Sequence, residues 1–344
     1  MQYEKYNAKN ASFPASALYS KIKPMTSPYL AMQAAVDIVN SSQHPTNKIA
    51  ATLFHPEQGW SISSTNHWPP LIDEKIGRNT RIGNSSGTVH AETDCLFQAT
   101  LHHNHATEGA SLCVTDPFCP NCAKNMAEAG IENIYIDHKG FVKDFAIRRG
   151  DHFENMSMRI AEKAGINVYE VNRKDLSIIP ICHASRDYHP ANEKPVLIEK
   201  CDKSLPFADE NTHVKEAIRD FPDIKFSLAY AQDKDNNQFY IIAPAHPAIG
   251  FNSRQDIYEI AHPQGKYSFI QEPTNRLLMT AVRKGLKIKN CETYTTDVPS
   301  SREFVNLVGA GIKTLTIKNK TLARDDFSFQ AMSLLQNKSI ITIR

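Results

Sequence analysis

The sequence predicts an α/β protein built from two similar units. Three observations carry this prediction. Stretches with strand patterning alternate with stretches of helical patterning, a proline-rich polar segment divides the chain, and the second half repeats the layout of the first. The length of 344 residues suits two domains. With 41% hydrophobic and 22% charged residues, the composition is that of a soluble globular protein.

The first half begins with an arm and continues as alternating elements. Residues 1–27 contain Ser, Ala, Asn and Pro without a clear period, which predicts an N-terminal arm. Apolar residues at helical spacing predict a helix over 28–40. The other predicted elements are strands at 48–54, 60–66, 110–115, 133–137 and 166–171, helices at 89–103, 120–129 and 154–163, and a polar loop at 68–87. Together these elements define a first domain over residues 28–172.

The second half follows a segment that breaks this rhythm. Residues 173–212 hold four prolines among polar residues, which predicts a linker. Residues 213–344 form the predicted second domain. Its Thr296-Asp297 and Gly311-Ile312 repeat Thr115-Asp116 and Gly130-Ile131, and both pairs are separated by the same offset, so no gap is needed between them. A constant offset of this kind indicates duplication, although two α/β units with similar spacing by chance are the alternative.

Two short motifs in the first half carry the chemistry. His90 and Glu92 stand near the start of one predicted helix, and Cys119 and Cys122 near the start of the next. Three such ligands leave the fourth position of a tetrahedral zinc ion to water, which is typical of a catalytic site. Glu92 can reach that water from outside the ligand shell and shuttle its proton. We therefore predict one zinc ion per chain on His90, Cys119 and Cys122, with Glu92 as the catalytic residue.

Each motif alone has a plainer interpretation. A Cys-x-x-Cys pair can be a redox pair or half of a structural zinc site. A redox role would leave His90 and Glu92 unexplained, and a structural zinc ion has no need of Glu92. The residues that could complete a structural site are Cys95, Cys113, His102, His103 and His105. The two motifs together favour the catalytic interpretation.

The second half lacks the ligands. Phe269-Ile270-Gln271-Glu272 aligns with Val89-His90-Ala91-Glu92 at nearly the same offset as the other repeated pairs. In this alignment the ligand positions hold Ile270, Ser300 and Glu303, and only the glutamate persists, as Glu272. Isoleucine and serine do not supply the donors of a zinc site. We therefore expect a degenerate second unit that binds no zinc and is catalytically silent.

These motifs resemble those of the cytidine deaminase superfamily, whose signature is His-x-Glu followed by Cys-x-x-Cys. The resemblance covers residues 28 to about 171. The run Cys-Pro-Asn-Cys-Ala-Lys at 119–124 is most similar to deoxycytidylate deaminases. The resemblance implies two α/β/α sandwich units, each with a mixed sheet of roughly five strands. It also implies hydrolytic loss of an exocyclic amine from a nucleobase.

The resemblance further implies a set of substrate contacts. Family members commonly place an asparagine at the end of the second strand against the sugar or base, and Asn66 matches this position; an ordinary turn residue is the alternative. Ala91 lies inside the His-Ala-Glu motif, and Trp68 is a candidate pocket wall. Phe118 stands where the family usually has proline before the first cysteine. Its ring either stacks on the base or packs in the core.

Charge and cysteine content limit the partners and the location. A net charge of +2 gives little evidence of a large nucleic-acid surface. No apolar run approaches the length of a membrane-spanning helix, which predicts no membrane span, and the N-terminus lacks the pattern of a secretion signal. Seven cysteines, an odd number, argue against a disulfide framework and favour a cytoplasmic protein.

The predicted function is a zinc-dependent hydrolytic deaminase of a nucleoside or nucleotide, of cytosine type and dCMP-like. The loop at 68–87 would close the pocket, with Arg78 and Arg81 available to a phosphate. The alternatives are a deaminase of a base in RNA or single-stranded DNA, and a non-catalytic zinc-binding protein with tandem domains. We expect the second unit to pack on the first and shape its site, as neighbouring subunits do in such deaminases. A homo-oligomer is a further expectation.

Overall fold

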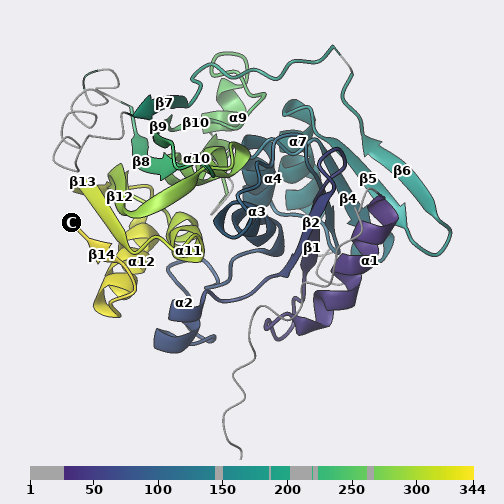
Figure 1. Ribbon diagram of the computed structural model, residues 1–344, viewed down its shortest axis with the longest axis horizontal. Helices are drawn as coiled ribbons and strands as arrows, with labels where there is room; N and C mark the ends of the chain where they lie inside the picture. Colours follow the sequence, from purple (N-terminus) through teal and green to yellow (C-terminus); the bar gives the residue numbers. More distant parts are fainter. Residues whose placement is uncertain (1–26, 144–149, 186, 202–218, 220–223, 262–266) are drawn as a thin grey trace, which may run out of the picture.

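The computed structural model describes residues 27–143, 150–185, 187–201, 219, 224–261 and 267–344. The predicted arm therefore lies outside the described residues, apart from Ser27. The described part of the chain forms two mixed six-stranded sheets with helices packed against them (Figure 1). This arrangement confirms the predicted α/β class. No helix in these ranges is both long enough and apolar enough to cross a bilayer.

The first sheet has the strand order β2-β1-β3-β4-β5-β6. Strand β1 pairs antiparallel with β2 and β3, the strands β3, β4 and β5 run parallel, and β6 returns antiparallel to β5. The bounds of the strands are β1 Ala50–His55, β2 Trp60–Thr65, β3 Ser111–Val114, β4 Asn133–Asp137, β5 Asn167–Asn172 and β6 Ser177–Cys182.

Helices cover both faces of this sheet. Helix α1 packs on one face, where it meets Phe54 of β1 and Cys113 of β3. Leu53 and Leu112, one position earlier on the same strands, turn to the opposite face and join the core beneath the other helices. The helices of this unit are α1 Pro28–Ile38, α2 Pro70–Lys75, α3 Ala91–Leu101, α4 Pro120–Glu128, α5 His138–Phe141, a π-helix Phe153–Met158 and α7 Arg159–Lys163.

The second sheet has the strand order β14-β13-β12-β8-β9-β7. Strands β9-β8-β12-β13-β14 match β2-β1-β3-β4-β5 in order and in relative direction, which supports the duplication inferred from the sequence. The bounds of the strands are β7 Leu197–Cys201, β8 Phe226–Gln232, β9 Gln238–Pro244, β12 Lys287–Val298, β13 Thr314–Ala323 and β14 Thr342–Ile343. The helices of this unit are α9 Ile257–Ala261, α10 Pro273–Arg283, α11 Ser301–Gly309 and α12 Asp326–Asn337. Strands β10 His246–Pro247 and β11 Ile270–Gln271 form a separate two-stranded sheet.

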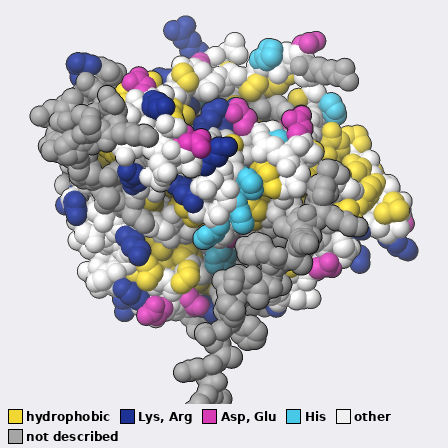
Figure 2. Space-filling view, in the orientation of Figure 1, with side chains coloured by type: hydrophobic (Ala, Val, Ile, Leu, Met, Phe, Trp, Pro, Cys, Tyr) yellow, Lys and Arg dark blue, Asp and Glu magenta, His cyan; other side chains and the backbone are white. Residues whose placement is uncertain are grey.

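The structure differs from the sequence expectations in three places. Each sheet has six strands instead of five, because β6 and β7 form inside the segment expected to be a linker. Both are edge strands, and an edge tolerates a proline such as Pro180. The outer side of β6 leaves Ile179 and Ile181 exposed, and Figure 2 shows hydrophobic side chains over this edge. The loop at 68–87 contains the short helix α2, which begins with a proline.

The two units pack helix against helix. Helices α3 and α4 of the first unit contact α10 and α11 of the second, and one core cluster contains residues from both. A buried ion pair crosses this interface, since Arg276 Nε lies 3.3 Å from Glu128 Oε1 and Arg276 is 1% exposed. Gly309 lets α11 approach Val89 closely, because a Cβ atom there would lie 2.4 Å from Val89 Cγ2.

Candidate metal centre and active site

Three side chains converge between the N-termini of α3 and α4. His90 Nδ1 lies 3.2 Å from Cys122 Sγ and 3.5 Å from Cys119 Sγ, and the three ligand atoms all lie within 4.8 Å of one another. A tetrahedral zinc ion at usual bond lengths separates its nitrogen and sulfur ligands by about 3.5 Å. The donor set and the spacing therefore fit zinc.

The helix starts direct these side chains at one another. His90 is the N-cap of α3, and Cys119 is the N-cap of α4, where Pro120 begins the helix. Neither side chain caps its own helix, in contrast to Ser300 at the equivalent place in the second unit. Cys122 follows in the first turn of α4 and completes the group.

Burial and neighbouring charges govern the thiols. Burial raises the pKa of Cys122 well above its usual value, and the nearby Cys119 raises this pKa further. Glu92 is 3% exposed in the first turn of α3, and its charge also raises the pKa of Cys122, which places the carboxylate beside the cluster. A divalent cation would reverse this balance, because it stabilises both thiolates.

The residues considered as a fourth ligand lie elsewhere. Cys95 Sγ donates to the carbonyl of Ala51, and Cys113 Sγ donates to that of Pro28, both at 3.4 Å. Among the described residues, the only His/Cys/Asp/Glu group close enough to hold a metal ion is His90, Cys119 and Cys122. Every cysteine whose side chain the structure describes is a free thiol.

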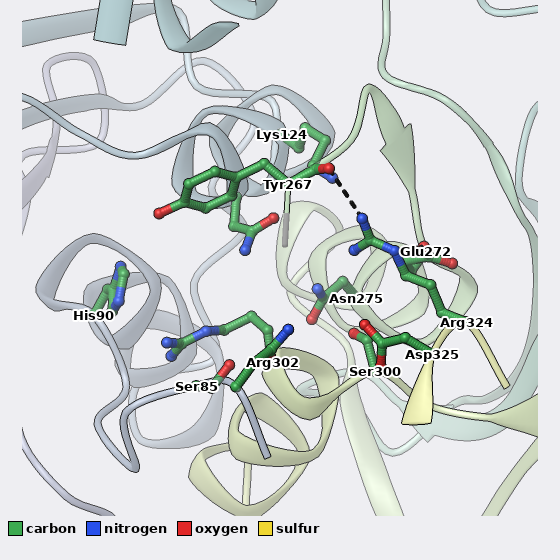
Figure 3. A pocket seen from close by; sticks show the side chains of 12 residues that line it. Ser85, His90, Lys124, Tyr267, Glu272, Asn275, Ser300, Arg302, Arg324 and Asp325 are labelled. Atoms are coloured by element: carbon green, nitrogen blue, oxygen red, sulfur yellow. Dashed lines mark hydrogen bonds and ion pairs between the residues drawn. The ribbon is translucent and has the colours of Figure 1, made fainter. Parts of the chain in front are cut away.

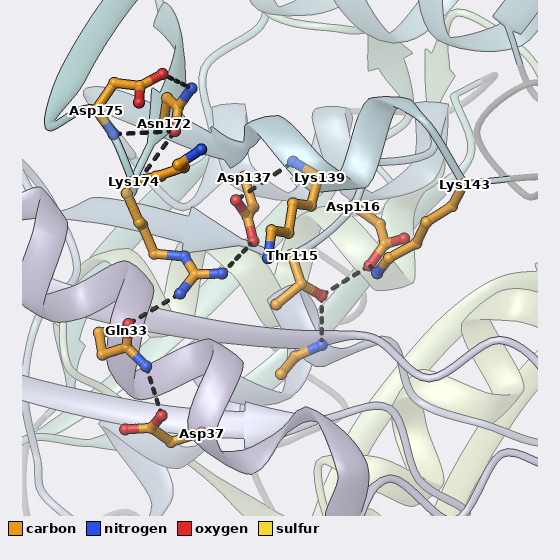
Figure 4. A network of polar contacts seen from close by, with 12 residues as sticks. Gln33, Asp37, Thr115, Asp116, Asp137, Lys139, Lys143, Asn172, Lys174 and Asp175 are labelled. Atoms are coloured by element: carbon orange, nitrogen blue, oxygen red, sulfur yellow. Dashed lines mark hydrogen bonds and ion pairs between the residues drawn. The ribbon is translucent and has the colours of Figure 1, made fainter.

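A polar clamp fixes the end of β3, from which the chain leads to Cys119 (Figure 4). Thr115 Oγ1 accepts a hydrogen bond from the Ala50 amide at 3.1 Å and donates to Asp116 Oδ2 at 2.8 Å. Lys143 Nζ also contacts Asp116 Oδ2, at 2.8 Å. Burial raises the pKa of Asp116, and Lys143 opposes this effect. The clamp therefore holds the turn that positions the first cysteine.

A polar cavity opens beside His90, between the two units (Figure 3). It contains about 510 Å³ of empty space, part of which is open to solvent. The first unit contributes Asn84, Ser85, His90, Asn121 and Lys124, and the second contributes Tyr267, Glu272, Asn275, Ser300, Arg302, Arg324 and Asp325. The cavity wall therefore comes from both halves of the chain.

Three cations of this wall were not predicted from the sequence as binding residues. Lys124 is 4% exposed, and burial lowers its pKa to about 8. Arg302 and Arg324 come from the second unit. Lys124 is the last residue of the Cys-Pro-Asn-Cys-Ala-Lys run at 119–124. Arg302 lies between the two degenerate ligand positions, so the alignment of the repeat could have directed attention to it.

The predicted substrate contacts lie near the cluster but are engaged within the protein. Asn66 is 5% exposed; its Oδ1 accepts from Ser42 Oγ at 2.6 Å and from the Ile49 amide at 3.0 Å, and its Nδ2 donates to the carbonyl of Asn47. Trp68 is 4% exposed and stacks on His44. Within the described part of the chain, Trp68 Nε1 has no hydrogen-bond acceptor.

The other two candidates are fully enclosed. Phe118 is 1% exposed and meets Phe153 edge to face, with ring centroids 5.4 Å apart. Packing in the core therefore accounts for its ring. Ala91 is buried as the first residue of α3, directly after His90.

The arginines expected to meet a phosphate do not line the cavity. Arg78 makes two hydrogen bonds to Asp73, at 2.8 and 2.7 Å, and its guanidinium lies over Trp68. Arg81 Nη2 donates to the carbonyl of Asn84 at 3.1 Å. Both side chains are committed to the loop that carries them.

The second unit requires one correction to the sequence alignment. Glu272 is the N-cap of α10, as His90 is of α3, so Glu272 stands opposite His90 and not opposite Glu92. Thr274 then takes the place of Glu92. Ser300 and Glu303 match Cys119 and Cys122 as expected. The segments that lead into α3 and α10 differ in length, which sequence identity alone did not reveal.

A carboxylate joins the two helix starts of the second unit. Glu303 accepts hydrogen bonds from the Ser300 amide at 2.8 Å and the Thr274 amide at 2.9 Å, so one side chain holds the N-termini of both α11 and α10. Glu303 is 2% exposed. Burial and then the nearby Glu272 raise its pKa to about 7.

Comparisons with known proteins each cover less than half of the chain. Residues 25–138 match the family model "Cytidine and deoxycytidylate deaminase zinc-binding region". An uncharacterized deaminase in the luxG 3' region of Aliivibrio fischeri is 25% identical over 127 residues, which span 37% of this chain and 81% of that protein. The dCMP deaminase of cyanophage S-TIM5, solved with dCMP and dUMP, is 20% identical with a TM-score of 0.31, covering 41% of this chain and 93% of that one. A structure from work on A-to-I editing by tRNA:A34 deaminases is 21% identical with a TM-score of 0.22, covering 34% and 82%.

Proposed function

Residues 25–138 belong to the cytidine deaminase superfamily, and from this premise we propose that the protein is a zinc-dependent hydrolase that deaminates a nucleoside or nucleotide. A cytosine base in a dCMP-like substrate is the favoured choice. The observation that carries the proposal is the convergence of His90, Cys119 and Cys122 beside the buried carboxylate of Glu92. A structural zinc site has no use for that carboxylate.

Each polar residue has a distinct role in this proposal. His90, Cys119 and Cys122 hold the zinc ion, and a zinc ion there would supply a nucleophile at neutral pH by lowering the pKa of a coordinated water toward ~7. The carboxylate of Glu92 accepts a proton from the attacking water. It donates this proton to the ring nitrogen. It then takes the remaining proton of the added hydroxyl as the new carbonyl forms, and donates that proton to the departing amine, which leaves as ammonia. The buried setting of Glu92 keeps the proton within this exchange.

The cavity supports a small substrate over a polymer. Its walls come from both units and combine cationic and hydrogen-bonding side chains that a single nucleotide could contact. Trp68 and the backbone at Ala91 and Phe118 remain candidates for contacts with the base. Asn66 would contact the sugar only by exchanging bonds it now makes to the 42–49 segment.

The second unit acts in this proposal as a covalently attached partner. We place the catalytic domain at residues 28–172 and the degenerate domain at 213–344. The second unit closes the cavity with side chains such as Arg302 and Tyr267, and its own helix starts are held by Glu303 instead of a metal ion.

The direct test is ammonia release by the zinc-loaded chain and its Glu92→Gln variant. A panel of bases, nucleosides, nucleotides and short oligonucleotides identifies the substrate. Glu92→Gln should retain zinc, measured by elemental analysis, yet lose activity by roughly 10²- to 10⁴-fold because the proton shuttle is gone. Glu57→Gln, which removes an exposed carboxylate from the β1–β2 turn, is the matched control. Unchanged turnover in Glu92→Gln would refute the assigned role.

A further inference from the structure

We propose that the cavity between the units contains a binding site for the 5′-phosphate of the substrate, in which Arg302 of the degenerate unit and Lys124 are the principal contacts. This inference rests on the proposed function and specifies its substrate class as a nucleoside monophosphate. It assigns the degenerate unit a part in substrate choice.

Arg302 reaches across from the second unit to the segment that carries the metal-binding histidine. Its Nη1 donates to the carbonyl of Thr88 at 2.6 Å, two residues before His90. The side chain is 9% exposed and lines the cavity together with His90. Figure 3 shows its guanidinium extended toward His90. A guanidinium carries five N–H donors in a planar fork, so it can hold the carbonyl of Thr88 and a phosphate oxygen at once.

Lys124 supplies a second, buried cation in the same cavity. Its Nζ donates to the carbonyl of Ile270 at 2.5 Å. Among the described residues, no carboxylate lies within ion-pair distance of this nitrogen. The carboxylates of Glu272 and Glu303 act on this buried cation only from beyond contact distance, so an anionic ligand beside the nitrogen would stabilise its charge.

The acidic residues of the wall are directed at other partners. Asp325 caps helix α12 by accepting from the Ser328 amide at 3.0 Å. Glu272 Oε1 lies 3.9 Å from Arg324 Nε. The wall as a whole contains three basic and two acidic side chains, so it keeps a positive charge beside His90. This charge suits a phosphate monoester attached to the nucleoside whose base lies at the metal centre.

The test compares each nucleoside with its own 5′-monophosphate. The pairs are cytidine and CMP, deoxycytidine and dCMP, adenosine and AMP, and guanosine and GMP, assayed for kcat/KM and, by calorimetry, for equilibrium binding. We expect a preference for the monophosphate that falls roughly 10- to 100-fold in Arg302→Gln, the loss typical of one charge-assisted contact. Arg302→Lys should restore part of this preference. Arg283→Gln, which removes a charge paired with Glu108 outside the cavity, should leave it unchanged.

Zinc content and binding of inorganic phosphate separate the site from general damage. Arg302→Gln should keep its zinc and lose phosphate binding. Equal turnover of a nucleoside and its monophosphate would overturn the phosphate site and leave the deaminase assignment intact. Tighter binding of monophosphates that depends on Arg302, without any ammonia release, would support the site and refute the proposed function. A preference for oligonucleotides over the monophosphate would also overturn the inference.

Discussion

Replacement of Glu303 by glutamine tests how the second unit holds together without a metal ion. The Glu303 carboxyl is buried, and its pKa is raised from 4.5 to about 7. A pKa raised in the folded state means that ionisation costs folding free energy. The stabilising contribution of the neutral form is fully present below about pH 4.5 and is lost as the pH rises through about 7, and it amounts to about 3 kcal/mol.

Glutamine keeps the shape of the neutral acid and removes this titration. Its amide has one acceptor oxygen, so it cannot accept all the hydrogen bonds that Glu303 accepts from the backbone amides of Ser300, Thr274 and Asn275. This loss costs about 1 kcal/mol. At pH 8, where the wild-type carboxyl is ionised, Glu303→Gln should therefore be more stable than the wild type by about 2 kcal/mol. At pH 4.5 it should be slightly less stable, because only the lost hydrogen bond remains.

The assay is urea unfolding at pH 4.5 and pH 8, followed by circular dichroism. The quantity to compare is the difference in unfolding free energy between variant and wild type, taken at each of the two pH values. The other titrating groups contribute equally to both proteins, so a change in this difference with pH reports on Glu303. Glu57→Gln, an exposed substitution, should show no such change. The reasoning fails if Glu303→Gln is less stable than the wild type by the same amount at both pH values.

Two further predictions concern the interface between the units. Arg276→Met should destabilise the chain by about 3–5 kcal/mol, because it leaves the buried carboxylate of Glu128 without its cationic partner. As a control, Glu108→Gln breaks an exposed ion pair and should cost less than about 1 kcal/mol. Urea midpoints measure both costs, and equal costs would contradict the role of burial. Gly309→Ala should lower the stability of the fold by about 1–3 kcal/mol, because its Cβ atom would lie 2.4 Å from Val89 Cγ2. In the control Gly150→Ala, the added Cβ atom meets no atom within 4 Å and should not destabilise the fold. Thermal unfolding distinguishes the two variants.

Local patterns in the sequence predict most of the first unit. Strand β4 has the predicted bounds, and α4 ends one residue earlier than expected. The convergence of His90 with Cys119 and Cys122 also follows from the sequence, because both helix starts lie at the same edge of the sheet. These features depend on short-range periodicity and on residue chemistry.

The features that the sequence did not reveal depend on edge pairing and on the packing of the two units. Strand β6 contains Pro180 and pairs with the preceding strand β5, and the short strand β7 pairs with β9, which lies further along the chain. Identity between the two halves placed Glu272 two residues from its structural counterpart, since loop length is not fixed by helix patterning. Lys124 and Arg302 meet in one cavity only because the two units pack together.

Asn121 and Arg302 occupy equivalent positions in the two units, and both line the same cavity. In a pair of identical chains related by two-fold symmetry, any substitution at such a position appears twice. A guanidinium beside one metal centre would then also stand between the cysteines of the other. A single chain that carries both copies is free of this constraint. One copy can keep the metal ligands while the other changes the charge of the shared wall. Under the proposed function, this asymmetry would separate chemistry from selectivity.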